Sequence, residues 1–234
     1  MKRSAKKKSK SRGTQLELAY PPGRGGVRPR AGRKPKGEKA GVSHAGREEF
    51  HARYPVHVAM KVVEGLPSLR SRPMFRVVQQ AILEARERLG MRVCEYSVQA
   101  NHLHLIVEAA GKVALSRGMR GLAVRIAKGV QRIAGCAGRV LADRYFAHIL
   151  RTPIEVKNAL QYVLENARRH GWRAIMFDPC SSALWFDGWR HLVDVPPSPS
   201  PLARARSWLL RIGWRHGGLL KFGAVKVKQQ PRPT

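Results

Sequence analysis

Residues 92–108 read RVCEYSVQANHLHLIVE, and this stretch predicts a β-hairpin. β-Branched and aromatic residues occur on both sides of Ala100-Asn101, a pair that suits a tight turn. We therefore expect two antiparallel strands, one over residues 92–98 and one over residues 102–108.

The second of these strands carries two histidines. Side chains in a strand alternate between the faces of a sheet, so Leu103 and Leu105 should point to a core. His102 and His104 should then point together to the opposite face, where two neutral imidazoles can hold one metal ion. The alternative is that two histidines share a solvated face by chance. His57, in an earlier expected strand, either flanks the pair or is simply a packed residue.

Outward from the hairpin, hydrophobic periodicity predicts the remaining elements of a folded domain. They are strands over 55–63 and 145–150 and helices over 74–89, 115–134 and 152–170. The order β-α-β-β-α-β-α indicates an α+β fold. We expect a ferredoxin-like, four-stranded antiparallel sheet with helices on one face, together with the last helix.

That last helix has a clear start and an unusual polar face. Thr152, Pro153 and Glu155 form an N-cap, a first-turn proline and a capping box. At 100° per residue, Tyr162 falls opposite the apolar stripe, among polar residues that include Arg169. An aromatic residue there is better explained by contact with a ligand than by burial, although a surface tyrosine is the simpler alternative.

Asn166 follows Tyr162 by one helical turn, so the two side chains should project together. An amide oxygen is a suitable ligand for a hard divalent cation, and Asn166 could join His102 and His104 around it. A tyrosine hydroxyl beside such a cation is a candidate nucleophile, but its ordinary pKa of about 10 means that it needs activation.

The charge of the chain points to a polyanionic partner. Its 234 residues include 45 Lys and Arg against 15 Asp and Glu, a net charge of +30, and an excess this large disfavours compaction unless a polyanion is near. A pocket for cationic substrates is therefore a poor fit, and nucleic acid is the first partner to expect. The hydrophobic share of 43% still provides for a core.

Much of that charge lies near the two ends of the chain. Residues 1–48 are expected to be a disordered basic arm, and residues 195–234 a Pro-rich spacer and a basic segment. The domain should span residues 49–194. Within the arm, Gly32–Gly37 resembles a minor-groove AT-hook, although a solvated tail is the alternative. The basic residues expected to contact DNA are Arg33, Lys34, Lys36 and Arg169.

The C-terminal segment contains one further candidate helix. Residues 202–214 are amphipathic and carry Trp208 and Trp214, which suits either a membrane surface or a helix that packs back on the domain. No uninterrupted 18-residue apolar run occurs, so no membrane span is expected. Three dispersed cysteines indicate reduced thiols in a cytosol rather than a disulfide framework.

Two motifs together resemble the single-tyrosine HUH transposases, which include IS200-like and REP-associated tyrosine transposases. They are Asn101–Ile106 (NHLHLI) and Tyr162–Asn166 (YVLEN), about 60 residues apart, with His170-Gly171-Trp172 following. The resemblance covers roughly residues 50–175, and Arg33-Lys34-Pro35 resembles the lead-in of such proteins. Gln99-Ala100 stands where many relatives have Met-Pro, and Ala167 where proline is frequent, which suggests a distinct branch.

The resemblance implies a bacterial, cytoplasmic, nucleoid-associated enzyme that acts on single-stranded hairpin DNA. His102, His104 and Asn166 would hold Mg²⁺ or Mn²⁺, and Tyr162 would attack the scissile phosphate to leave a 5′-phosphotyrosine and a free 3′-hydroxyl. Relatives often form dimers, so a homodimer is possible.

Three other functions are compatible with parts of the sequence. A catalytically inactive, domesticated hairpin-binding protein of the same fold needs only the basic surface. An RNA-binding sheet is disfavoured because the hairpin strands offer only Tyr96 for base stacking. A basic membrane-surface protein would account for the two ends of the chain but for neither motif.

Overall fold

The computed structural model describes residues 46–171, 177–190 and 200–223. These residues form an α+β fold around one antiparallel sheet, in which neighbouring strands follow the order β2-β3-β4-β1-β5. The strands are β1 (Val56–Lys61), β2 (Glu87–Arg88), β3 (Met91–Val98), β4 (His102–Ala109) and β5 (Phe146–Ile149). The α+β class is thus confirmed, and all four predicted strands are present.

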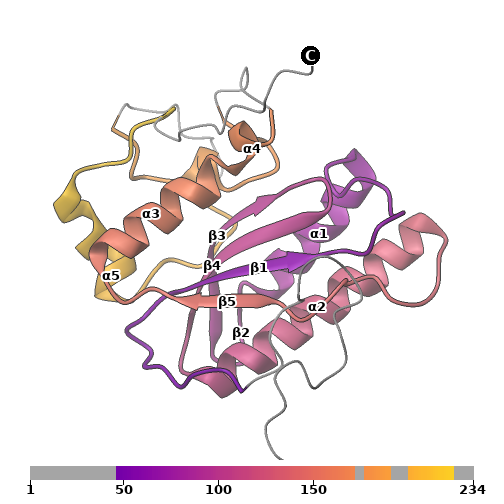
Figure 1. Ribbon diagram of the computed structural model, residues 1–234, viewed down its shortest axis with the longest axis horizontal. Helices are drawn as coiled ribbons and strands as arrows, with labels where there is room; N and C mark the ends of the chain where they lie inside the picture. The colour runs from indigo at the N-terminus through magenta and orange to yellow at the C-terminus, as the bar shows by residue number, and fades with distance from the viewer. Residues whose placement is uncertain (1–45, 172–176, 191–199, 224–234) are drawn as a thin grey trace, which may run out of the picture. The chain divides into compact units, whose positions relative to one another are not determined.

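Helices cover both faces of the sheet (Figure 1). One face packs against α1 and α2, and the other packs against α3 and the short C-terminal elements. The helices are α1 (Arg72–Ala85), α2 (Lys112–Ala134), α3 (Pro153–Leu164), α4 (Asn166–Arg169) and α5 (Trp208–Arg211), with 3-10 turns η1 (Ala183–Trp185) and η2 (Gly213–Gly217). The layer between the sheet and α3 is where the candidate site lies.

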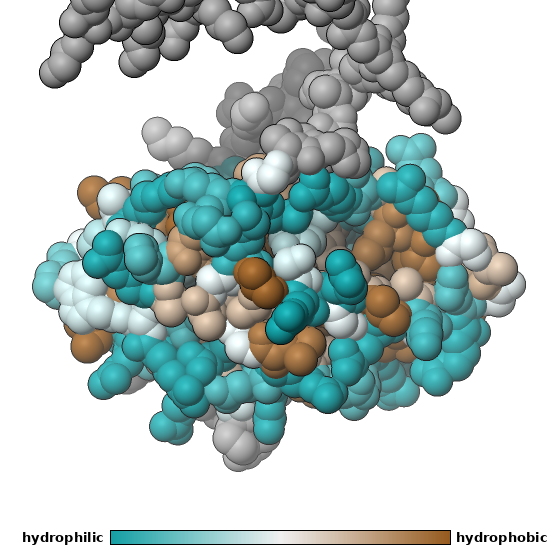
Figure 2. Space-filling view, turned by 90° about the horizontal axis from the view of Figure 1, so that it is seen from below, coloured by the Kyte–Doolittle hydropathy of each residue, from teal (hydrophilic) through white to brown (hydrophobic). Residues whose placement is uncertain are grey.

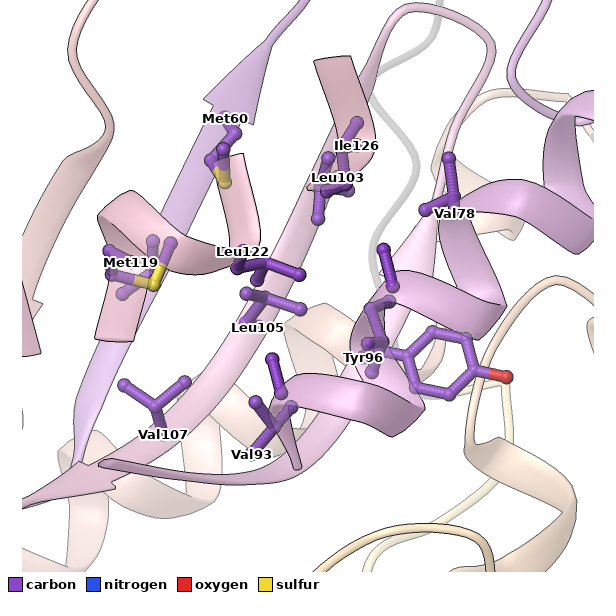
Figure 3. Packing of buried hydrophobic residues seen from close by; sticks show 14 of the residues in the cluster. Met60, Val78, Val93, Tyr96, Leu103, Leu105, Val107, Met119, Leu122 and Ile126 are labelled. Atoms are coloured by element: carbon purple, nitrogen blue, oxygen red, sulfur yellow. The ribbon is translucent and has the colours of Figure 1, made fainter. Parts of the chain in front are cut away.

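The larger core fills the space between the sheet and α1 and α2 (Figure 3). Leu103 and Leu105 of β4 point into it and are fully buried, together with Tyr96 of β3. Each fully buried leucine contributes about 2 kcal/mol through the hydrophobic effect. The predicted inward face of β4 is therefore confirmed, and the register of β4 fixes its histidines on the other side.

Within the described residues the sheet has five strands rather than the predicted four, because β2 was not predicted. The helix expected to reach Leu89 ends at Ala85, and Glu87–Arg88 instead pair with the start of β3. Leu89 and Gly90 both have positive φ angles, 56° and 74°, as a tight two-residue hairpin turn requires. Leu89 is 60% exposed, so the apolar periodicity that included it did not reflect burial.

The predicted helix over residues 152–170 is also interrupted. Its start is as expected, since the Thr152 hydroxyl accepts a hydrogen bond from the Glu155 amide at 3.2 Å. The helix breaks at Glu165, which has φ −106° and ψ 16°. The Glu165 carboxylate is buried and accepts hydrogen bonds from Gln161 and from the backbone amide of Gly223. A buried contact with the C-terminal segment therefore coincides with the break.

The C-terminal segment packs against the domain, as one of the two alternatives for residues 202–214 expected. Trp214 is 1% exposed. It lies with Leu160 of α3 in a second, smaller hydrophobic cluster, on the face of the sheet that α3 covers. Trp208 stays 53% exposed. The anchor is Glu108 of β4, whose carboxylate accepts hydrogen bonds from the backbone amides of Arg206 and Ser207. The division of the chain at residue 195 into a domain and a Pro-rich spacer with a basic segment stays a prediction.

One face of the described part of the chain can be judged from its surface colouring (Figure 2). The face seen in Figure 2 is mostly hydrophilic, with hydrophobic residues in small separate groups. Among the described helices, none is long and apolar enough to cross a membrane. All three cysteines are free, consistent with the predicted reduced thiols. At the N-terminal edge, Arg47 lies over the Tyr145 ring at 3.6 Å, so the last residues assigned to the basic arm pack on the domain.

Candidate functional site

Two histidines and a tyrosine meet between the sheet and α3. His102 and His104 lie on the face of β4 opposite the larger core, with ring centroids 5.0 Å apart. The Tyr162 ring of α3 stands edge-on to the His104 ring, with centroids 5.1 Å apart and an interplanar angle of 84°. The structure thus brings the two predicted histidines together with the predicted tyrosine.

A third histidine completes this group from the neighbouring strand. β1 pairs with β4 so that Ala59 lies opposite His104, which places His57 on the same face two residues away. His57 Nε2 lies 3.1 Å from His104 Nδ1, within hydrogen-bond distance. The Tyr162 ring also contacts His57, with centroids 5.6 Å apart.

The hydrogen bonds leave one nitrogen of each β4 histidine available. His104 Nε2 is buried and has no hydrogen-bond partner among the described residues. Its lone pair is available when Nδ1 carries the proton and donates to His57 Nε2. His102 Nδ1 likewise donates to Asn101 Oδ1 at 2.8 Å, which leaves its Nε2 with the lone pair.

Burial keeps these imidazoles neutral at neutral pH. Burial, followed by the repulsion that a proton on His104 would meet from any proton on His57, His102 or His170, lowers the pKa of His104 to about 3. Burial and His148 lower the pKa of His57 to about 4. For His102, burial, His170 and Lys61 lower the pKa to about 4. Neutral imidazole is the form that binds a metal ion.

Positive charge is placed beside the tyrosine. The Arg169 guanidinium lies over the Tyr162 ring, 4.9 Å from its centroid. His170 is exposed, and its ring centroid lies 5.1 Å from that of His102. A phosphate that approached Tyr162 would therefore meet the Arg169 guanidinium.

Asn166 is fully buried at the start of α4, directly after the break in the helix. Neither its amide oxygen nor its amide nitrogen has a hydrogen-bond partner among the described residues. Each buried amide atom without a hydrogen bond lowers the stability of the folded state by about 1–3 kcal/mol. A ligand that bonds to these two atoms would remove that loss. Because the helix breaks at Glu165, the direction of Asn166 does not follow from regular helical spacing after Tyr162.

The side chains at this site can hold a divalent cation only if oxygen ligands join the histidine nitrogens. No group of three or more His, Cys, Asp or Glu side chains among the described residues is arranged to hold a metal ion. His57 cannot be counted as a ligand while its Nε2 is bonded to His104. The free nitrogens of His102 and His104 would therefore need oxygen ligands, from side-chain amides or from the substrate.

Three of the predicted DNA contacts, Arg33, Lys34 and Lys36, lie outside the described residues, whereas Arg169 lies at the site. The sequence leaves the role of His57 open. Its only signal is that His57 alternates with apolar residues in a predicted strand and so should point away from the core. The sequence marks His170 as the end of the last predicted helix and as part of the run after Tyr162–Asn166, but gives it no role at the site. The pairing of β1 with β4 brings His57 to the site, and the end of α4 brings His170 beside His102.

No family model and no curated protein matches the chain. Among solved structures, a REP-associated tyrosine transposase bound to a REP hairpin is similar, with a TM-score of 0.50 and 17% sequence identity. The match covers 60% of this chain and 82% of that one. At this identity the similarity shows a shared fold.

Proposed function

We propose that this chain is a DNA transposase or nickase that cuts and rejoins single-stranded hairpin DNA. Tyr162 is the nucleophile, and His102, His104 and Asn166 hold Mg²⁺ or Mn²⁺. The observation that carries the proposal is the contact between the Tyr162 and His104 rings, beside a buried His104 Nε2 without a partner among the described residues. The fold shared with a hairpin-bound transposase adds support.

The chemistry proposed for Tyr162 is a transesterification. Its hydroxyl oxygen attacks the scissile phosphorus, and the bond from phosphorus to the 3′ oxygen breaks. The phenolic proton ends on the departing oxygen, so the products are a 5′-phosphotyrosine and a free 3′-hydroxyl. Attack by the 3′-hydroxyl of a second strand reverses the step and completes strand transfer without a nucleotide cofactor.

The residues of the site divide this work. A divalent cation, when bound, supplies Lewis-acid polarisation of the phosphate. His102 and His104 present their Nε2 lone pairs, His57 orients His104, and Arg169 attracts the phosphate toward Tyr162.

The competing function is that of a catalytically inactive hairpin-binding protein with the same fold. Labelled single-stranded hairpin DNA separates the two, because binding can be read by anisotropy and the covalent adduct on a denaturing gel. We expect an adduct with Mn²⁺, none with a chelator, and retained binding in both. Binding without an adduct under every metal condition would favour the inactive protein. A homodimer stays a prediction, which light scattering can check.

A further inference from the structure

Gln99 is a buried amide with an unused oxygen. It lies directly after β3, is 2% exposed, and donates from Nε2 to the Ser97 hydroxyl at 2.8 Å. Its Oε1 is buried and has no hydrogen-bond partner among the described residues. A buried carbonyl oxygen without a partner is costly, so a ligand that fills this position would stabilise it.

The register of the hairpin places this amide beside the histidines. Ser97 lies opposite His104, and the Gln99 backbone amide donates to the His102 carbonyl at 2.7 Å. Residues that face each other across an antiparallel pair share a face of the sheet, with Cβ atoms about 5 Å apart. Gln99, Ser97, His102 and His104 therefore lie on one face, away from Val98 and its core.

The hydrogen bond to Ser97 gives the amide a direction. With Nε2 engaged by the hydroxyl, Oε1 is the atom left to face a ligand. Mg²⁺ and Mn²⁺ prefer oxygen ligands, and two imidazoles with the single amide oxygen of Asn166 would leave either ion short of them. We propose that Gln99 supplies an oxygen ligand to the cation held by His102 and His104, with Ser97 as the residue that orients it.

This inference rests on the proposed function, because it needs a metal at the histidine pair. It adds a ligand that the two motifs do not contain. The opposite orientation, in which the amide nitrogen faces a phosphate of the substrate, is a different role. The two roles respond in opposite ways to a carboxylate at position 99, which strengthens a cation site and repels a phosphate.

The test measures Mn²⁺ binding to the full chain without DNA, by electron paramagnetic resonance of free Mn²⁺. We expect Gln99→Met, which keeps the volume and removes the oxygen, to weaken Mn²⁺ binding at least about tenfold, the effect of losing even a supporting residue of a metal site. Gln99→Glu should bind Mn²⁺ as tightly as the wild type or more tightly. Ser97→Ala should give an intermediate loss.

The matched control is Gln79→Met. Gln79 also donates from Nε2 to a hydroxyl, that of Tyr96, but it lies on α1 across the sheet. Thermal melting confirms that each variant is folded. Unchanged Mn²⁺ affinity in folded Gln99→Met, or weaker binding in Gln99→Glu, would overturn the ligand role. If the wild type itself shows no saturable Mn²⁺ binding, the metal site of the proposed function fails, and the ligand role with it.

Discussion

His57 Nε2 lies 3.1 Å from His104 Nδ1, so a histidine of β1 is hydrogen-bonded to the histidine of β4 that contacts Tyr162. When His104 donates through Nδ1 to His57 Nε2, its own Nε2 keeps the lone pair that can bind a metal ion. His57 is in this way a positioning residue for the proposed metal ligand. A residue that accepts a hydrogen bond from the second nitrogen of a metal-binding histidine raises the basicity of that ligand and fixes the orientation of its ring.

The first prediction concerns that hydrogen bond. His57→Leu should weaken Mn²⁺ binding by about 10- to 100-fold, because His104 loses its acceptor. His57→Gln should recover most of the affinity, since a side-chain amide oxygen can accept the same bond. Calorimetric titration of the chain with Mn²⁺ measures both variants.

His148→Leu is the control for His57. His148 lies opposite His57 on β5 but makes no hydrogen bond to His104 among the contacts of the described residues. This variant should bind Mn²⁺ within about twofold of the wild-type affinity, a smaller change than is expected on losing a residue that supports a metal ligand. Equal losses in His57→Leu and His57→Gln would contradict the acceptor role.

The metal-free protein should lose stability as the pH falls below about 6.5. The folded-state pKa values, about 4 for His57 and His102 and about 3 for His104, lie below the ordinary value of 6.5. The unfolded chain therefore binds more protons in this window, so the free energy of unfolding rises with pH up to about 6.5. For buried His104 alone the slope is about 1 kcal/mol per pH unit.

Thermal melts in chelator between pH 5 and 7.5 check this dependence. The His57→Gln variant should show a shallower slope, because one of the three titrating groups is gone. A melting temperature that is flat across this range would contradict the burial of the three imidazoles.

Arg169 is predicted to help hold the DNA phosphate near Tyr162, over whose ring its guanidinium lies. Arg169→Gln should weaken binding of single-stranded DNA and reduce the slope of log K against log salt by about one. It should also lower the rate of adduct formation at saturating DNA. Arg120→Gln, an exposed change on α2, is the control for general charge, and an equal effect on the adduct rate would contradict a role at the site.

Glu108 is predicted to hold the C-terminal segment in place. Its buried carboxylate accepts hydrogen bonds from the amides of Arg206 and Ser207 and from Arg92. Glu108→Ala should lower the free energy of unfolding by about 3 kcal/mol, because buried donors lose their acceptor. Urea denaturation measures this loss, and tryptic cleavage near Arg206 should become faster. Glu64→Ala, at a 92% exposed side chain, should change neither measurement.

Local periodicity was sufficient to predict the hairpin and the shared face of its histidines. Alternation is clear over residues 102–105, since Leu103 and Leu105 are large and apolar while His102 and His104 are polar. The same reasoning failed at Leu89, where an apolar residue in helical register belongs to a turn. Two residues of strand are too short to leave a periodic signal of their own.

Contacts between distant parts of the chain could not be predicted. His57 precedes His104 by 47 residues, and their hydrogen bond depends on β1 being the neighbour of β4. The break at Glu165 involves Gly223, 58 residues later. Alternation and helical spacing describe one element at a time. They therefore contain no information about either of these contacts between elements.

The most direct measurement for the whole account is the covalent adduct itself. Full-length wild type and Tyr162→Phe are incubated with labelled single-stranded hairpin DNA and Mn²⁺, and the adduct is separated on a denaturing gel and mapped by mass spectrometry. We predict a wild-type adduct at Tyr162, none in the Tyr162→Phe variant, and similar DNA binding by both. An adduct in Tyr162→Phe, or one mapped to another residue, would contradict the account.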